Sequence, residues 1–504
     1  MPAMTVFLAQ TAASAINTWP FVVLAISVVS LMIMIGKLRM HPFMALLFAA
    51  LLAGLIADKD TFSIIGKDGK ASDMPFLTGT VELVSKGLGD TARDIAISIA
   101  LASIIGMALM ESGAADRGVR AFLGFFGEKH AGWALMWSTY FLSVPIFFDT
   151  MFMLMAPLAK ALRVRTGKDY LLYVLAVSCG GVITHSLTVP HPGPIAMVDT
   201  LKMDVGVSIM GGLLGGLLPA IVGFMACVWF NKRMVIPLRE TPGTSLEDLN
   251  AIVDKKTSEL PSFWISILPV ILPIILISLS SVFKVTADSA GTGTAWAISL
   301  QKAFGSLESF TATRTWVDFF GHKNIALLLG ALISLITLAK QKRLGLGSLE
   351  KMIGPPLETA GMIILITSAG GAFGLMLRSA GVGDAVKEVA SGYAMNLVLL
   401  GWLVSFVVRI AQGSATVAMI TASAIIAPLL DGATLDCHRI YVFLAIGWGA
   451  MACSWMNDSG FWVVSRLAGL TEREMLKSFT VLLTIISLTG LIITFTMSKL
   501  VPLI

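Results

Sequence analysis

The feature that most constrains this chain is a long series of apolar stretches, each close to the length that crosses a membrane as a helix. A spanning helix needs about 20 predominantly apolar residues. Ten stretches of this kind lie at roughly 21–36, 43–57, 95–110, 170–189, 205–230, 262–283, 324–340, 360–377, 440–455 and 479–498. The sequence therefore predicts an all-α integral membrane protein with about ten spanning helices.

Composition excludes a soluble alternative. Only 13% of the 504 residues are charged, whereas soluble domains average about 25%. A single soluble core stops growing near about 250–300 residues, so a soluble chain of this length would need the polar surfaces of two domains. This chain does not have enough charged residues for those surfaces, and lipid is the solvent that its composition fits.

Two further apolar stretches, about 132–160 and 394–430, are too long for one crossing and are interrupted by polar residues. The first carries Pro145 and then Asp149 and Thr150, and the second carries Arg409 and the polar run 412–416. Irregular backbone at membrane depth is tolerated where protein or a water-filled cavity satisfies it. We therefore expect two re-entrant hairpins.

The basic residues support this topology. If residue 1 lies outside, both hairpins must return to the side from which they enter for the dense basic clusters to share the inner face, as the positive-inside rule requires. Those clusters are Lys37 and Arg39; Arg117, Arg120 and Lys129; Lys160, Arg163, Arg165 and Lys168; Lys232, Arg233 and Arg239; Lys340, Lys342 and Arg343; and Arg466, Arg473 and Lys477. The net charge of +5 is distributed among short loops, so nucleic acid is not an expected partner.

The chain also repeats itself at a shift of about 266 residues, which places Thr150 on Thr416. We predict a first repeat over 20–233, a cytoplasmic linker over 234–260 and a second repeat over 261–498. Each repeat contains one hairpin and one broken helix, the latter at about 170–204 and 440–470. Because the first hairpin would enter from inside and the second from outside, the repeats are inverted, which is typical of secondary transporters.

The ligand site of such a protein is expected near mid-membrane, where the breaks meet. A half-helix beginning near Pro194 would direct unpaired N–H groups and a positive dipole end at an anion. Hydroxyl and amide groups near the other breaks suit a small hydroxylated carboxylate. The candidate substrate-binding residues are Thr150, His191, Gly193, Ser414, Thr416, Asn457 and Ser459.

Candidate proton-coupling residues are Asp149, His191 and Asp458, because these titratable groups lie at breaks. A carboxylate at membrane depth is costly, which favours function over a structural cap for Asp149. For Asp458, a structural role as an N-cap fits the sequence as well as a role in proton coupling does. Arg409 fits two roles, binding the anion or pairing with Asp149 or Asp458. His185 is more simply a hydrogen-bonded packing residue.

Three motifs resemble the gluconate permease (GntP) family over about 20–498: Pro190-His191-Pro192-Gly193-Pro194, Gln412-Gly413-Ser414-Ala415-Thr416-Val417-Ala418 and Asn457-Asp458-Ser459-Gly460-Phe461-Trp462. The resemblance implies proton-coupled uptake of gluconate or related sugar acids, or of D-serine. It also implies a bacterial inner membrane protein that forms homodimers, with elevator-type scaffold and transport subdomains.

A related sodium–dicarboxylate branch carries Ser-Asn-Thr at its hairpin tips. The matching positions here are Phe148-Asp149-Thr150 and Ser414-Ala415-Thr416. The asparagine is absent from both and an acid stands in one, which favours coupling to protons over coupling to sodium.

The sequence therefore predicts a proton-coupled symporter of a small hydroxy or sugar acid, with no cofactor or metal. A sodium-coupled carrier of an organic anion or D-serine is the nearest alternative. A passive channel fits inverted broken helices less well. A membrane enzyme or an ATP-driven pump would need a motif such as HExxH, GxSxG or a P-loop, which the sequence lacks.

Overall fold

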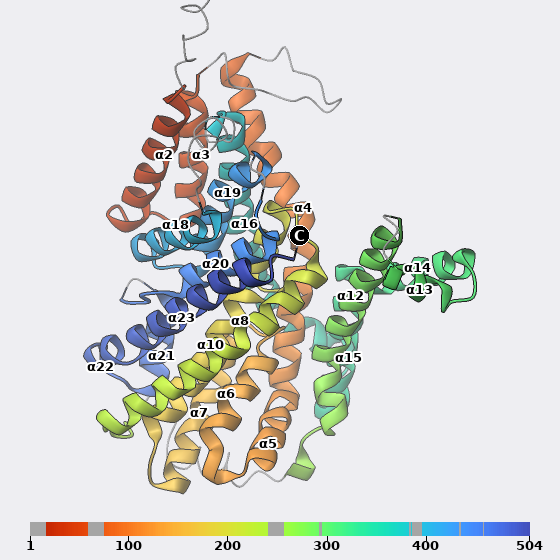
Figure 1. Ribbon diagram of the computed structural model, residues 1–504. Helices are drawn as coiled ribbons and strands as arrows, with labels where there is room; N and C mark the ends of the chain where they lie inside the picture. The colour runs from red at the N-terminus through yellow and green to blue at the C-terminus, as the bar shows by residue number, and fades with distance from the viewer. Residues whose placement is uncertain are drawn as a thin grey trace, which may run out of the picture.

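The computed structural model describes residues 17–58, 75–239, 257–291, 295–382, 385, 396–432, 435–456 and 458–503. These residues fold into packed α-helices (Figure 1). The helices up to the predicted linker are α2 (Trp19–Gly36), α3 (Pro42–Ile56), α4 (Phe76–Glu111), α5 (Ala114–Phe126), η1 (Glu128–His130), α6 (Ala131–Leu142), α7 (Phe148–Thr166), α8 (Tyr170–Leu187), α9 (Pro192–Thr200) and α10 (Val205–Arg233).

After the predicted linker the chain forms a second series of helices. They are η2 (Thr257–Glu259), α12 (Phe263–Gly291), α13 (Ala295–Lys302), α14 (Leu307–Gly321), α15 (Lys323–Lys342), α16 (Leu346–Ser379), α18 (Leu397–Gln412), α19 (Ala415–Gly432), α20 (Arg439–Met451), α21 (Ser459–Ala468), α22 (Glu472–Lys477) and α23 (Phe479–Leu500). The short helices α13 and α14 project from the body beside α12 (Figure 1).

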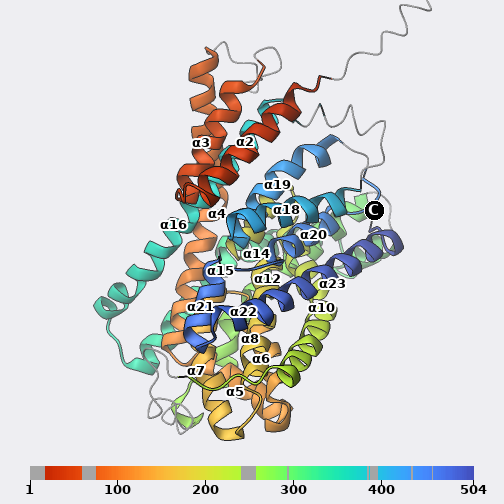
Figure 2. The same ribbon diagram turned by 90° about the vertical axis from the view of Figure 1, so that its left-hand side faces the viewer.

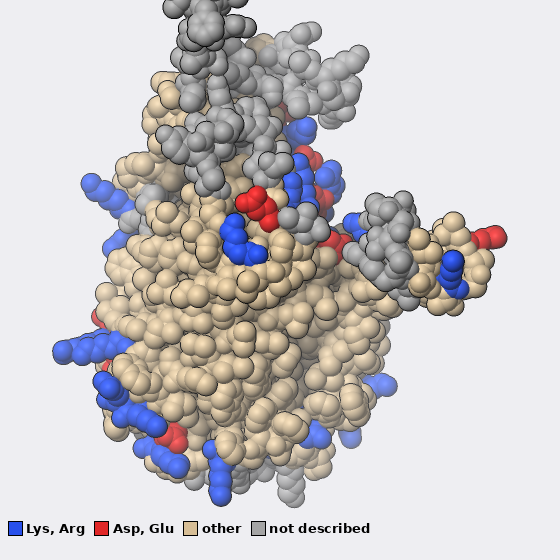
Figure 3. Space-filling view, viewed as in Figure 1, with Lys and Arg blue, Asp and Glu red and all other residues tan. Residues whose placement is uncertain are grey.

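Each predicted spanning stretch coincides with a helix, although 440–455 extends four residues beyond the end of α20 and 170–189 two beyond the end of α8. Among the described residues, seven segments are long and apolar enough to cross a membrane: Phe76–Glu111, Tyr170–Thr200, Val205–Arg233, Phe263–Lys284, Lys323–Lys342, Leu346–Ser379 and Glu472–Leu500. The other predicted spans, in α2, α3 and α20, are shorter apolar helices. On the face that Figure 3 shows, a broad middle band carries few charged side chains, as a lipid-facing surface requires.

Two helices are much longer than expected. The structure extends α4 to 36 residues and α16 to 34, although the apolar runs predicted only 95–110 and 360–377. Glu82 and Lys86 interrupt the hydropathy of α4 without interrupting its helix, since both are good helix formers. The two helices pack against each other along the body (Figure 2). A Cβ at Gly87 would lie 2.7 Å from the Cα of Ala372, so this close approach requires glycine.

Both interrupted stretches are divided where the sequence predicts. The first becomes α6 and α7, separated by residues 143–147, and both helices pack against α8. The second becomes α18 and α19, which are separated by residues 413–414 and pack against each other. The structure also breaks the apolar run between α8 and α9 and that between α20 and α21. We call α6–α7 the first hairpin and α18–α19 the second hairpin.

Equivalent helices begin about 266 residues apart, at the predicted shift. The matching first residues are Ala131 and Leu397, Phe148 and Ala415, Tyr170 and Arg439, and Pro192 and Ser459. Contacts between these equivalent helices are reciprocal, because α9 packs on α19 and α21 packs on α7.

Candidate functional site

Four helix N-termini meet around one central cavity of about 310 Å³. The helices are α7, α9, α19 and α21, one from each hairpin and one from each broken helix. Residues from all four first turns line the cavity: Phe148 and Asp149, Pro192, Ala415 to Val417, and Gly460. Because a helix N-terminus carries unpaired N–H groups and a partial positive charge, this convergence favours an anion.

The two halves differ in how these N-termini are capped. In the second half, the Asp458 carboxylate accepts a hydrogen bond from the N–H of Gly460 at 3.0 Å, and the Ser414 hydroxyl accepts one from Val417 at 3.3 Å. In the first half, neither α7 nor α9 has a side-chain cap. The prolines that begin α9 lack N–H groups, so α7 presents more free donors to the cavity than α9 does.

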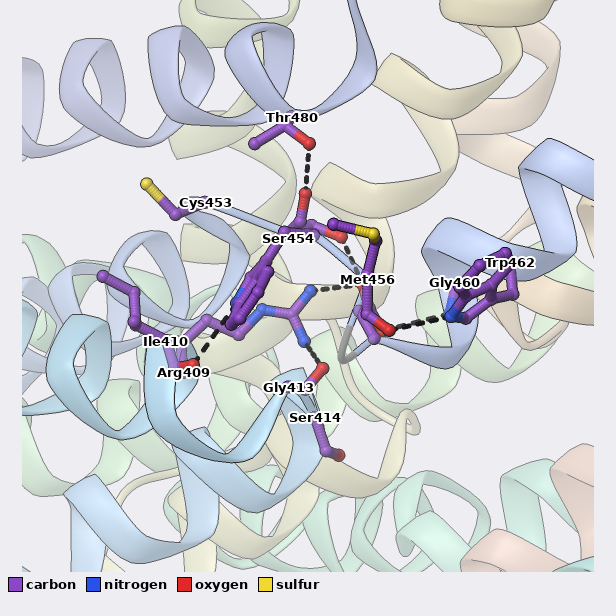
Figure 4. A network of polar contacts seen from close by, with 12 residues as sticks. Arg409, Ile410, Gly413, Ser414, Cys453, Ser454, Met456, Gly460, Trp462 and Thr480 are labelled. Atoms are coloured by element: carbon purple, nitrogen blue, oxygen red, sulfur yellow. Dashed lines mark hydrogen bonds and ion pairs between the residues drawn. The ribbon is translucent and has the colours of Figure 1, made fainter. Parts of the chain in front are cut away.

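A buried ion pair joins the second hairpin to the second broken helix (Figure 4). Arg409, in the last turn of α18, lies 2.5 Å from the Asp458 carboxylate, and its side chain is only 3% exposed. The guanidinium also donates to the carbonyl of Gly413 at the hairpin tip, and Ser454 donates to Asp458. Of the two roles predicted for Arg409, the structure shows the pairing with Asp458. The guanidinium Nε has no hydrogen-bond partner among the described residues, and Arg409 lines the cavity.

Asp149 has a different environment. It lies in the first turn of α7, lines the cavity and is exposed to it. Among the described residues, none makes an ion pair or a hydrogen bond with its carboxylate. Among the described residues, the charged side chains that line the cavity are one arginine, Arg409, and two acids, Asp149 and Asp458.

A pair of histidines lies beside this cavity, with His191 buried and His185 half-buried. The rings of His185 and His191 are edge to face, with centroids 4.8 Å apart. Nε2 of His191 donates to the carbonyl of Ser143 at 2.8 Å, while Nδ1 of each ring has no partner within the described chain. His185 lines the cavity, and His191 packs against His185. The prediction that His185 is a packing residue missed this position, because which face of α8 points to the cavity depends on the tertiary fold.

The remaining predicted residues fall into three groups. Ser414 and Thr416 line the cavity. Gly193 packs against Met419 of α19, where a Cβ would collide with the Met419 side chain. Asn457 and the side chains of Thr150 and Ser459 lie outside the part of the chain that the structure describes.

Comparison with known proteins gives consistent matches over nearly the whole chain. The family model described as GntP family permease matches residues 19–501. A gluconate permease of Pseudomonas aeruginosa is 30% identical over 467 residues, which cover 93% of this chain and 95% of that protein. The Gnt-II system L-idonate transporter of Escherichia coli is 26% identical over 94% of this chain and 98% of its own length.

A solved structure shares the fold. The crystal structure of the YdaH transporter of Alcanivorax borkumensis, described as having an unusual topology, matches with a TM-score of 0.59. The match covers 92% of this chain and 100% of that one at 13% sequence identity, so the likeness concerns the fold alone.

Proposed function

Because the chain belongs to the GntP family of permeases, we propose that it carries gluconate or a related small hydroxy-acid monocarboxylate, together with protons, across the bacterial cytoplasmic membrane. Membership makes it a multi-pass membrane permease and not an enzyme. The observation that carries the proposal is the convergence of four helix N-termini and Arg409 on one cavity. Its volume, about 310 Å³, lies at the lower end of the range for small-molecule sites, about 300–1,000 Å³.

The substrate carboxylate would lie between the free N–H groups of α7 and the guanidinium of Arg409. Both are donors in a site of low dielectric constant, where hydrogen bonds to charged groups are strong. The hydroxyl groups of the substrate would meet Ser414 and Thr416, with Thr150, Asn457 and Ser459 as further candidates. Gly193 would act through packing on Met419, which holds α9 against α19.

Proton coupling follows from the charges around the cavity. With both acids ionised, Asp149 and Asp458 outnumber Arg409, and an incoming carboxylate would be repelled. Protonation of Asp149 removes one negative charge and leaves Arg409 balanced by Asp458. Substrate and proton then favour each other's binding, which is the thermodynamic requirement for symport. His185 and His191 form the second candidate path for the proton, since His185 lines the cavity and the Nδ1 of each ring has no hydrogen-bond partner among the described residues.

The movement that we propose is an elevator. The reciprocal contacts between halves support an inverted repeat, and two distinct hydrophobic cores support two bodies. One core unites the first hairpin, both broken helices and much of the second hairpin, which would form the transport body, and it extends to residues of α4, α5, α10, α12, α15 and α23 around them. The other joins α2, α3 and α16 with part of α4, and it contacts the second hairpin through Val417 and Ile425 of α19. The helices α2, α3, α4 and α16 would belong to the scaffold and to a homodimer interface.

The test is uptake of radiolabelled gluconate into proteoliposomes with an inward proton gradient and no sodium. We expect accumulation above equilibrium that a protonophore abolishes. Accumulation that requires sodium at fixed pH would contradict proton coupling. If gluconate is not taken up but another hydroxy acid or D-serine raises the melting temperature and is accumulated, the fold assignment stands and the substrate assignment fails.

A further inference from the structure

A second cavity of about 220 Å³ adjoins the central one, and we call it the α4 pocket. Its walls come from α4, from the break in the first hairpin and from α16: Ala102, Ser103, Gly106, Met107, Met110, Glu111, Pro145, Phe147, Pro356 and Thr359. Phe147 and Thr359 line both cavities. These two side chains therefore form the partition between the central cavity and the α4 pocket.

The α4 pocket leads from this partition to the protein surface. Its α4 wall follows the last turns of the helix to Glu111, whose side chain is 44% exposed. Glu111 forms an ion pair with Lys342 in the last turn of α15. Lys340, Lys342 and Arg343 make up one of the basic clusters that the positive-inside rule assigns to the cytoplasm. The far end of the pocket therefore lies at the cytoplasmic side.

The partition is narrow because α4 and the hairpin break approach closely. A Cβ added at Gly106 would be 3.6 Å from the carbonyl oxygen of Pro145, so a side chain much larger than alanine would fill the space. Phe147 is the residue immediately before α7, and its ring centroid is 6.0 Å from that of His191. An aromatic ring at a helix start, beside a cavity on each side, can turn without disturbing a helical hydrogen bond.

We propose that the α4 pocket is the cytoplasmic vestibule through which the substrate leaves the central cavity, and that the ring of Phe147 closes the passage between them. This inference rests on the proposed transport function and adds the route and its gate. The wall suits a hydroxylated substrate in transit, because the oxygens of Ser103 and Thr359, whose hydroxyls donate to helix carbonyls, can still accept hydrogen bonds from its hydroxyl groups. The outlet carries the ion pair of Glu111 and Lys342. No group in this wall would hold the anion as Arg409 does.

The route is tested with single cysteines on α4, read by peptide mass spectrometry so that the native cysteines can stay. Met107→Cys lies in the vestibule wall, and Ile104→Cys, one turn away on α4, is a matched control outside it. With a membrane-impermeant maleimide, we expect residue 107 to be labelled at least about tenfold faster in inside-out than in right-side-out vesicles, and gluconate to slow that labelling. Equal labelling from both sides, or labelling at 107 no faster than at 104, would overturn the route.

The gate is tested by Phe147→Ala, with Phe141→Ala on α6 as the control. We expect Phe147→Ala to release preloaded gluconate from proteoliposomes severalfold faster without a proton gradient and to accumulate less. Phe141→Ala should behave as the unmodified protein does. A Phe147→Ala protein that melts normally and accumulates gluconate fully would overturn the gate. If the unmodified protein carries no gluconate, the proposed substrate fails, while the sidedness of labelling at residue 107 still decides the route.

Discussion

Replacing Arg409 by glutamine removes one partner of the buried ion pair and leaves Asp458, which is 8% exposed, without its counter-charge. Breaking a buried pair in this way costs about 3–5 kcal/mol of unfolding free energy. Asp458 keeps its hydrogen bonds from Ser454 and Gly460, so we expect the lower value, about 3 kcal/mol. Asp458→Asn should cost a similar amount, since it strands the guanidinium in the same place.

The double variant Arg409→Gln, Asp458→Asn separates the ion pair from its parts. Two neutral amides can still hydrogen-bond, and neither leaves a buried charge. We therefore expect the double variant to be more stable than the sum of the single effects by about 2 kcal/mol. Unfolding in mixed micelles, followed by tryptophan fluorescence, measures the three variants and the parent. Strict additivity would refute the reasoning that the pair is a coupled buried unit.

Measurements of gluconate affinity distinguish the structural role of Arg409 from a role in binding the anion. Loss of the guanidinium should weaken gluconate binding by about 1.5–3 kcal/mol, which raises Kd by about tenfold to about 150-fold. The double variant should regain stability but not affinity. Asp458→Asn, in contrast, frees the guanidinium and should bind the anion at least as tightly as the parent. Unchanged affinity in Arg409→Gln would leave Arg409 with a purely structural role.

The remaining predictions concern one acid and two glycines. Asp149→Asn should abolish accumulation driven by a proton gradient but retain gluconate exchange. Asp116→Asn is the peripheral control, and full accumulation by the Asp149→Asn protein would exclude Asp149 as the proton carrier. Gly180→Ala should destabilise the protein by about 1–3 kcal/mol, because its Cβ would collide with the carbonyl of Met136 where α8 crosses α6. Gly124→Ala, with nothing within 4 Å of the added carbon, should instead stabilise α5 by up to about 1 kcal/mol, and equal effects of the two changes on melting would contradict the packing argument.

The positions of the helices and of their breaks could be predicted from the sequence because they depend on local properties. Apolar length determines which segments can cross a membrane, and the prolines around His191 and Gly413 at the second hairpin interrupt helices wherever those helices lie. Four helices of the second half likewise begin 266–269 residues after four helices of the first half, close to the shift that the sequence predicts. The lengths of α4 and α16 were underestimated because their charged turns lower hydropathy without lowering helix propensity.

Only the tertiary structure decided which of these breaks share a cavity and which side chains face it. Arg409 could have paired with Asp149 or with Asp458, and the choice depends on how the second hairpin packs against α20, just before Asp458, and not on either local sequence. His185 likewise lines the cavity because of the tertiary fold. Its separation of six residues from His191 does not determine which face of α8 meets the cavity. Local sequence determines where a helix begins, but the direction in which its first turn points is determined by contacts with residues far away in the chain.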